Sequence, residues 1–276
     1  MSEIGIVDIR EINKTIQNKY NLDFSVFALT SYRLRIERLM NHNNINNVDQ
    51  LIKKLENNKD FFDDFLYELT VPSTEMFRDP SLWRWLRDDF LPRELEKSQS
   101  KFQIWLPNCV SGGELFSLTI LLKECNLLNK VHIIASSLTN KSLENIKEGK
   151  YDLKKIEIST ENYKRFQGKM NLKDYYRLER YHAYFDLSLI ENVEFIKQDL
   201  YFDNIPENIK LIIFRNNFIY YTPKFQEEVQ NKLLKSLLPG GHLIIGIKEK
   251  MINNMYQNEF ELINQNENVY RKKLNI

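Results

Sequence analysis

Short apolar runs alternate with helical segments from residue 102 onward. The runs FQIWL, VHIIASS, IKLIIF and HLIIGIK have strand character, and segments such as GELFSLTILLKECNLL and NKSLENIKEG stand between them. Strands separated by helices of this length predict βαβ units and a parallel sheet. The closing stretch FELINQNENVYRKKL predicts a hairpin at the end of that sheet. The expected fold class is therefore α/β, with a doubly wound and mostly parallel sheet.

The alternation also divides the chain into parts. Residues 1–68 contain no convincing strand and several amphipathic stretches, which predict a small N-terminal helical domain. Residues 69–100 are expected to form a linker and a helix that leads into the sheet. Residues 101–276 then form the sheet domain, and the aromatic-rich stretch 156–196 interrupts the alternation. This stretch predicts a small inserted subdomain.

Local signals support this division. Asp79 is expected to cap the linker helix, with Pro80 in its first turn. Asn47 or Asp49 is expected to cap an earlier helix. The segment Pro239–Gly241 predicts a turn that leads into a strand. The stretch SYRLRIERLMNHN predicts a helix whose apolar side carries Leu34, Ile36, Leu39 and Met40.

Composition excludes several classes of function. No run of eighteen apolar residues and no basic-then-apolar leader occurs, so we expect a cytoplasmic protein with no direct membrane insertion. Two cysteines and four scattered histidines show no metal-ligand spacing, so no metal is expected. A net charge of +1 argues against a nucleic-acid partner, which would require a strongly basic domain.

The first loop of the sheet domain lies in WLPNCVSGGELFSL, residues 105–118. Gly112 and Gly113 permit close backbone contact, and the following helix offers unpaired N–H groups. The loop is neither a P-loop nor a G-x-G-x-x-G fingerprint. These features favour a cofactor with little phosphate, such as S-adenosylmethionine. A tight turn with no ligand explains the glycines equally well.

The run LTVPSTEMFRDPSLWRWLRDDFLP, residues 69–92, resembles the signature of CheR-type chemoreceptor methyltransferases. The segments IWLPNCVSGGELFSLTILL, IIASSLTNKSLENIKEGKYDL and LIIFRNNFIYYTPKFQEEV resemble further segments of that family in the same order. The resemblance covers nearly the whole chain. It implies a Rossmann-like methyltransferase sheet, S-adenosylmethionine as cofactor with S-adenosylhomocysteine as product, and methylation of glutamates on the helical signalling region of a chemoreceptor or related sensor.

The resemblance also implies site residues. Arg78 matches the active-site arginine, and Tyr220 matches the tyrosine at the methyl-transfer site. An arginine can hold a glutamate by paired charge-assisted hydrogen bonds, although a salt bridge of Arg78 with Asp79 or a neighbouring acid is the structural alternative. Core packing is the alternative for Tyr220. The residues implied to bind the cofactor are Thr74, Arg78, Asn108, Gly112, Glu114, Ser137, Asp199, Leu200, Arg215 and Asn216.

Several positions depart from the family pattern. Ser137 replaces the acid that would grip the ribose, Asn108 replaces a glycine, and Gly113 replaces the first of two glutamates. Asp199 replaces an asparagine near the adenine, and Phe214 replaces a cysteine and adds bulk near the cofactor. These changes predict weaker cofactor binding. Two hypotheses follow: a protein-glutamate O-methyltransferase, or an inactive methyltransferase-like module that docks on a receptor or signalling partner.

Two surfaces are candidates for the partner. Arg33, Arg35 and Arg38 are expected to meet an acidic receptor helix, although a solvated helix face is the usual meaning of such residues. The segment 175–185 resembles the subdomain that binds a receptor's tail peptide in some members of the family.

Overall fold

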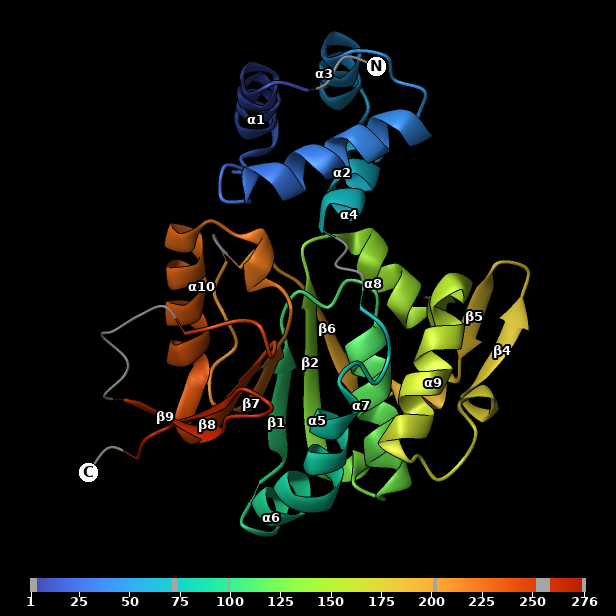
Figure 1. Ribbon diagram of the computed structural model, residues 1–276, viewed down its shortest axis with the longest axis vertical. Helices are drawn as coiled ribbons and strands as arrows, with labels where there is room; N and C mark the ends of the chain where they lie inside the picture. The colour runs from blue at the N-terminus through green and yellow to red at the C-terminus, as the bar shows by residue number, and fades with distance from the viewer. Residues whose placement is uncertain (1–3, 71–73, 99, 201–202, 252–258, 275–276) are drawn as a thin grey trace.

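The computed structural model describes residues 4–70, 74–98, 100–200, 203–251 and 259–274. A region of helices stands above a larger region built on a twisted sheet (Figure 1). The helical region comprises α1 (Ile6–Tyr20), α2 (Leu29–His42), α3 (Val48–Asn57) and α4 (Lys59–Thr70). None of the helices within the described ranges is long and apolar enough to cross a membrane.

The four N-terminal helices enclose their own apolar core. Buried apolar residues recur at helical spacing along these helices. Ile9, Ile12 and Ile16 of α1, for example, pack against residues of α2, α3 and α4. Asn47 caps α3, because its side chain accepts a hydrogen bond of 2.9 Å from the N–H of Gln50. The expectation for Leu34 is wrong, since this residue is 45% exposed and Tyr32 occupies the buried side of α2 instead.

The helix after the signature is interrupted once. It consists of α5 (Pro80–Trp85), a π-helical turn η1 (Leu86–Phe90) and α6 (Leu91–Glu96). Pro92 lacks an N–H, and in a regular α-helix its ring would crowd the carbonyl of Asp88, a clash that the wider π turn avoids. Asp79 does not cap this helix with its side chain: its φ is 55°, and its carboxylate accepts a hydrogen bond from Arg215.

The larger sheet has seven strands in the order β6-β2-β1-β7-β8-β10-β9. Strands β6, β2, β1, β7 and β8 are parallel, and β10 and β9 are antiparallel. This arrangement confirms the predicted doubly wound sheet with a hairpin at its end. The strands are β1 (Phe102–Leu106), β2 (Val131–Ser137), β6 (Val193–Lys197), β7 (Ile209–Phe214), β8 (Leu237–Ile245), β9 (Phe260–Asn264) and β10 (Val269–Lys272).

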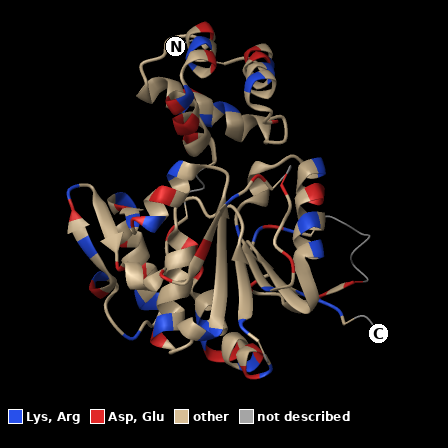
Figure 2. Cartoon of the chain, turned by 180° about the vertical axis from the view of Figure 1, so that it is seen from behind, with Lys and Arg blue, Asp and Glu red and all other residues tan. Residues whose placement is uncertain are grey.

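Helices cover both faces of this sheet. Ile104 belongs to the core shared with α7 (Gly113–Glu124), whereas Trp105, the next residue of β1, belongs to the core under α10 (Pro223–Ser236). A further helix, α8 (Asn140–Lys147), packs beside β2 and β6. The central strands carry hardly any charge, and charged side chains lie on the surrounding elements (Figure 2). The 3-10 turns are η2 (Leu128–Lys130), η3 (Leu153–Lys155), η4 (Leu172–Tyr175), η5 (Leu187–Leu189) and η6 (Phe218–Tyr220).

The segment Pro239–Gly241 does not form the predicted turn. It lies inside β8, where the register against β7 shifts between Ile209 and Leu211. Gly240 has a φ of 77°, a conformation that glycine adopts without strain. The segment is therefore an irregularity within a strand, and α10 leads directly into β8.

A second, three-stranded sheet lies beside the main one. It has the order β3-β5-β4, with β3 (Lys150–Asp152), β4 (Tyr176–Glu179) and β5 (His182–Phe185), and α9 (Ile156–Phe166) packs near it. This sheet begins before residue 156, and β6, from Val193, belongs to the main sheet. The division of the chain into domains at residues 68, 100 and 156–196 stays a prediction.

Buried Glu124 ties this small-sheet region to α7. Its carboxylate accepts hydrogen bonds from the hydroxyls of Tyr163 and Tyr175, the latter at 2.9 Å, and from the N–H of Lys169 at 3.2 Å. Because all three donors lie on the segment after β3, one side chain of the main domain fixes the position of the small-sheet region.

We predict that Glu124→Ala lowers the free energy of unfolding by about 3 kcal/mol, because it leaves buried donors without an acceptor. Glu124→Gln is the control: it keeps an oxygen acceptor and should cost only about 1 kcal/mol. Urea unfolding of both variants measures the difference. Equal losses would show that the hydrogen bonds to Glu124 do not hold the small-sheet region.

Candidate functional site

The candidate site lies where the strand order reverses, outside the carboxyl ends of β1 and β7. The helical region closes over this edge. The N–H of Ala28 donates to the carbonyl of Tyr220 and the N–H of Thr222 donates to the carbonyl of Val26, both at 2.8 Å. Residues 26–28 and 220–222, which lie far apart in the sequence, are thus joined above the loops of the sheet, and we call this junction the roof.

The loop after β1 approaches the signature segment closely. A Cβ added at Gly113 would stand 2.9 Å from the carbonyl oxygen of Thr74. The hydroxyls of Thr74 and Ser111 are 2.6 Å apart, so they form a hydrogen bond. The departure at Gly113 therefore has a structural reason: a glutamate there would push the Thr74 segment away from the loop. Gly112 has a φ of 73°, which favours glycine.

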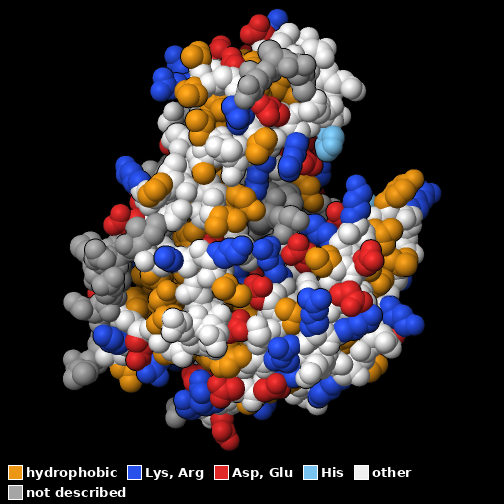
Figure 3. Space-filling view, viewed as in Figure 1, with side chains coloured by type: hydrophobic (Ala, Val, Ile, Leu, Met, Phe, Trp, Pro, Cys, Tyr) orange, Lys and Arg blue, Asp and Glu red, His pale blue; other side chains and the backbone are white. Residues whose placement is uncertain are grey.

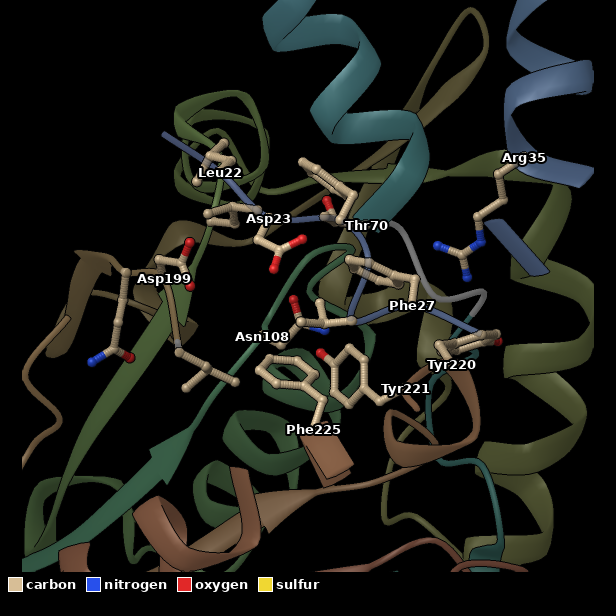
Figure 4. Close-up of a pocket in the computed structure, with 15 residues that line it drawn as sticks. Leu22, Asp23, Phe27, Arg35, Thr70, Asn108, Asp199, Tyr220, Tyr221 and Phe225 are labelled. Atoms are coloured by element: carbon tan, nitrogen blue, oxygen red, sulfur yellow. The ribbon is translucent and has the colours of Figure 1, made fainter. Parts of the chain in front are cut away.

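Two hollows flank this loop. The smaller, of about 300 Å³ with its open mouth, is lined by Thr74, Gly112 and Glu114 among others. The larger, of about 700 Å³ with its open mouth, lies between the helical region and the sheet. Figure 4 shows the larger hollow, with Asp199 on one side and Tyr220 on the other. Its lining includes Asp23, Phe27, Arg35, Asn108, Gln198, Asp199, Leu200, Tyr220, Tyr221 and Phe225.

Asn108 separates the two hollows. Among the described residues that line them, it is the one they share. Its φ of 56° is the left-handed conformation that asparagine tolerates. Its side-chain N–H donates to the side-chain oxygen of Asn217 at 2.6 Å. A ligand that extends through both hollows would meet this pair, which gives a geometric basis for the predicted effect of the glycine-to-asparagine change.

Arg215 is the centre of a buried charge cluster beside the smaller hollow. It is 1% exposed, and its guanidinium donates to the carboxylate of Glu114 at 3.4 Å, to the carboxylate of Asp79 and to the carbonyl of Arg78 at 3.2 Å. Burial raises the pKa of Glu114 to about 7, and the positive charge of Arg215 opposes that shift. The Glu114 carboxyl group therefore gains or loses its proton near neutral pH.

Glu249, which the sequence does not single out, fixes the backbone after β7. Its carboxylate accepts hydrogen bonds from the N–H groups of Asn216 at 2.9 Å and Gly246 at 2.6 Å. Burial raises the pKa of Glu249. Asn216 has a φ of 56°, and the hydrogen bond to Glu249 helps to hold it in this conformation. Asn216 supports the loop after β7 and does not line either hollow.

Ser137 and Gln198 present unsatisfied polar atoms at the ends of adjacent strands. The Ser137 hydroxyl is buried and has no hydrogen-bond partner among the described residues, and the same is true of the side-chain oxygen of Gln198. The N–H of Gln198 donates to the carbonyl of Ser137 at 2.8 Å, so the two residues are neighbours. Buried polar atoms without partners suit a hydroxyl-bearing ligand. Gln198 is not among the residues predicted from the sequence, but its position directly before Asp199, a predicted cofactor-binding residue, could have indicated it.

Asp199 and Leu200, predicted near the adenine, line the larger hollow. The backbone N–H of Asp199 is not available to a ligand, because it donates a hydrogen bond of 2.7 Å to the carboxylate of Asp203. Phe214 does not add bulk to either hollow. It is fully buried under α10 and meets Phe218 edge-to-face, with ring centroids 4.9 Å apart.

The backbone of Arg78 is held by hydrogen bonds, and its side chain is partly exposed to solvent. Its carbonyl accepts hydrogen bonds from Arg215 and from the indole N–H of Trp83 at 2.9 Å. Its side chain is 40% exposed and lies 3.6 Å from the carboxylate of Glu75. The structural alternative for Arg78, an ion pair with Asp79 or a neighbouring acid, is present in its second form: the partner is Glu75, whereas Asp79 binds Arg215.

Tyr220 lies at the other hollow. The Arg35 guanidinium stands 4.4 Å from the centre of its ring, an arrangement visible in Figure 4. The expectation that Arg35 faces a receptor together with Arg33 and Arg38 is wrong for Arg35, because its side chain lies in the junction between the helical region and the sheet. The structure gives no direct contact between Tyr220 and Arg78 within the described residues.

Known families match both regions of the chain in order. Residues 8–70 match the family described as "CheR methyltransferase, all-alpha domain", and residues 72–269 match the family described as "CheR methyltransferase, SAM binding domain". The chain belongs to the CheR methyltransferase family. This confirms the resemblance seen in the signature and the predicted fold class, and it makes the chain a member of a family of S-adenosylmethionine-binding methyltransferases.

Relatives of this CheR-family chain match it along most of its length. A protein of Pseudomonas putida, provisionally described as the methyltransferase Cher3, is 29% identical over 266 residues, which cover 96% of this chain and 97% of the relative. The chemotaxis protein methyltransferase of Listeria monocytogenes is 25% identical and covers 89% of this chain and 91% of its own length. That of Borreliella burgdorferi is 25% identical, with 90% and 89% covered.

The residues of this CheR-family chain fit S-adenosylmethionine. Gly112 and Gly113 line the smaller hollow at the start of α7, and Glu114 offers a carboxylate to an ammonium group. Gln198 lines the larger hollow and offers an unpaired oxygen to a hydroxyl, whereas its neighbour Ser137 is buried and lines neither hollow. The larger hollow has aromatic and aliphatic walls that suit a flat ring.

Proposed function

We propose that this protein transfers the methyl group of S-adenosylmethionine to glutamate side chains of a chemoreceptor or related sensor protein. The observation that carries the proposal is the match of both CheR domains, in order, over residues 8–70 and 72–269. The names of the relatives, which are chemotaxis protein methyltransferases, support chemotaxis as the setting.

Three parts of the site would hold the cofactor. Glu114, kept in place by Arg215, would bind the amino group of its methionine end, beside Thr74 and Gly112. Ser137 and Gln198 would meet the ribose hydroxyls. Asp199 and Leu200 would lie along the adenine, and a ligand that reaches both hollows would meet the pair of Asn108 and Asn217.

The chemistry requires mainly positioning. When bound, S-adenosylmethionine supplies a methyl group activated by a positively charged sulfur. A substrate carboxylate oxygen attacks that methyl carbon, the carbon–sulfur bond breaks, and a methyl ester and S-adenosylhomocysteine result, with no proton transferred. Arg78 would orient the incoming carboxylate by paired hydrogen bonds, in competition with Glu75. Tyr220, steadied by Arg35, would line the path of the substrate.

The first experiment is calorimetric titration with S-adenosylmethionine and S-adenosylhomocysteine. We expect the unmodified protein to bind both, and Ser137→Asp to bind them about tenfold to a hundredfold more tightly, because a carboxylate is a stronger acceptor for ribose hydroxyls. Ser137→Ala is the matched control and should bind more weakly than the unmodified protein. No binding by the unmodified protein, with recovery in Ser137→Asp, would identify an inactive module and refute the enzyme proposal.

The raised pKa of Glu114 leads us to predict that cofactor binding depends on pH. Its pKa of about 7 means that the carboxylate gains a proton as the pH falls below neutrality, and the cofactor's ammonium then loses its counter-charge. The affinity should fall by up to about tenfold per pH unit from about pH 7.5 to about pH 5.5. Calorimetry across this range measures the effect. Glu114→Gln should bind weakly with a flat pH profile, and a sloping profile in that variant would assign the titration to another group.

The identity of the acceptor group is tested by the stability of the product. We expect methyl groups transferred to a chemoreceptor cytoplasmic fragment to be released as methanol by mild base, because a carboxyl methyl ester hydrolyses readily. Arg78→Lys keeps the charge but loses the paired geometry, so it should lower the transfer rate about tenfold or more, and more than it lowers cofactor affinity. Arg93→Lys on α6 is the control. Base-stable product would contradict methylation of glutamate.

A further inference from the structure

A groove of about 1610 Å³, counting its open side, lies between α4, α8 and the hairpin of β4 and β5. In the views of Figures 1 and 3, this is the recessed corner between the helical region and the small sheet. Its lining carries four lysines and two acids, which are Lys141, Lys150, Lys154, Lys155, Glu68 and Asp152. Positive charge therefore exceeds negative charge along the groove, although the whole chain has a net charge of only +1.

Most of this positive charge is not neutralised within the chain. Lys141 forms an ion pair with Asp64. Lys150, Lys154 and Lys155 have no ion pair within 4.0 Å among the residues that the structure describes. Burial lowers the pKa of Lys155, and Asp152 and Glu75 oppose the shift without reaching ion-pair distance. An anionic group in the groove would relieve this imbalance.

The floor of the groove is joined to the signature segment. Ser111 and Tyr151 line the groove. The Ser111 hydroxyl bonds the Thr74 hydroxyl at 2.6 Å, and the Tyr151 hydroxyl donates to the Thr74 carbonyl and accepts from the N–H of Met76, both at 3.2 Å. The charge of Glu75, the partner of Arg78, acts on Lys155. The groove therefore runs beside the backbone that carries the proposed catalytic arginine.

We propose that this groove binds an acidic segment of the protein substrate that flanks the glutamate to be methylated. The inference rests on the proposed function, because a substrate that offers several glutamates is acidic. Glu68 and Asp152 on the rim would repel a uniform polyanion, whereas a peptide can place its carboxylates between them. Tyr67 and Tyr181, the latter 80% exposed, offer apolar contact to such a peptide. A peptide is therefore favoured over a nucleic acid.

The test measures peptide binding without cofactor or methyl transfer. The probe is a fluorescein-labelled peptide of about 20 residues with a glutamate in every helical turn, followed by fluorescence anisotropy at low salt. We expect Lys150→Glu/Lys154→Glu to weaken binding at least about fivefold. The matched control, Lys101→Glu/Lys130→Glu, makes the same change in net charge at exposed lysines near the amino ends of β1 and β2, and should weaken it less than about twofold.

Lys155→Met provides a second variant that introduces no new acid beside Glu75, and it should also weaken binding. Thermal unfolding of each variant confirms that the fold is intact. Equal weakening in the groove and control variants would overturn the proposal, because the effect would then be one of overall charge. An oligonucleotide of equal charge that binds more tightly than the peptide, with the same dependence on Lys150 and Lys154, would also overturn it.

Peptide binding in the groove and methyltransferase function are tested by separate measurements. Titration with S-adenosylmethionine tests the cofactor site, and the groove variants should leave that affinity unchanged. Loss of peptide binding in Lys150→Glu/Lys154→Glu together with no cofactor binding by any variant would support the groove and refute the enzyme. Cofactor binding with no peptide binding by the unmodified protein would refute the groove alone.

Discussion

The buried guanidinium of Arg215 connects the parts on which the site depends. It follows β7, it bonds Glu114 at the start of α7, and it bonds Asp79 and the carbonyl of Arg78 in the signature. An unpaired charge at such a depth would be strongly destabilising, so the three segments must stay together while the arginine is buried. Arg215 thereby positions both the acid suited to the cofactor and the arginine suited to the substrate.

The order of strands and helices could be predicted from the sequence because burial on two faces leaves continuous apolar runs such as IKLIIF. Local chemistry was predictable where a residue acts on its neighbours, as Asn47 does at a cap. The failures have long-range causes. Asp79 was expected to cap a helix, yet a cation distant in the sequence takes its carboxylate. Leu34 fits a helical apolar stripe, but Tyr32 fills the core of the helical region.

The candidate site shows the same limit. The signature and the glycine loop identified the region, and the structure brings Thr74, Gly112 and Glu114 around one hollow. Sequence reasoning missed Glu249, since nothing local marks a side chain whose partners lie in distant segments, and it passed over Gln198 although this residue directly precedes Asp199. It also treated Gly113 as a lost acid, whereas the close approach of Thr74 gives this glycine a role of its own.

The contacts of the roof above the larger hollow join the helical region to the sheet. Tyr220 bonds Ala28 through its backbone and meets Arg35 through its ring, so the residue proposed to line the reaction path is also a fastener between the helical region and the sheet. A cofactor bound in this hollow would touch both the helical region and the sheet, so its release would respond to the contacts between them. Substitutions in the helical region would then change how long the spent cofactor stays bound, while the reacting groups stay unchanged.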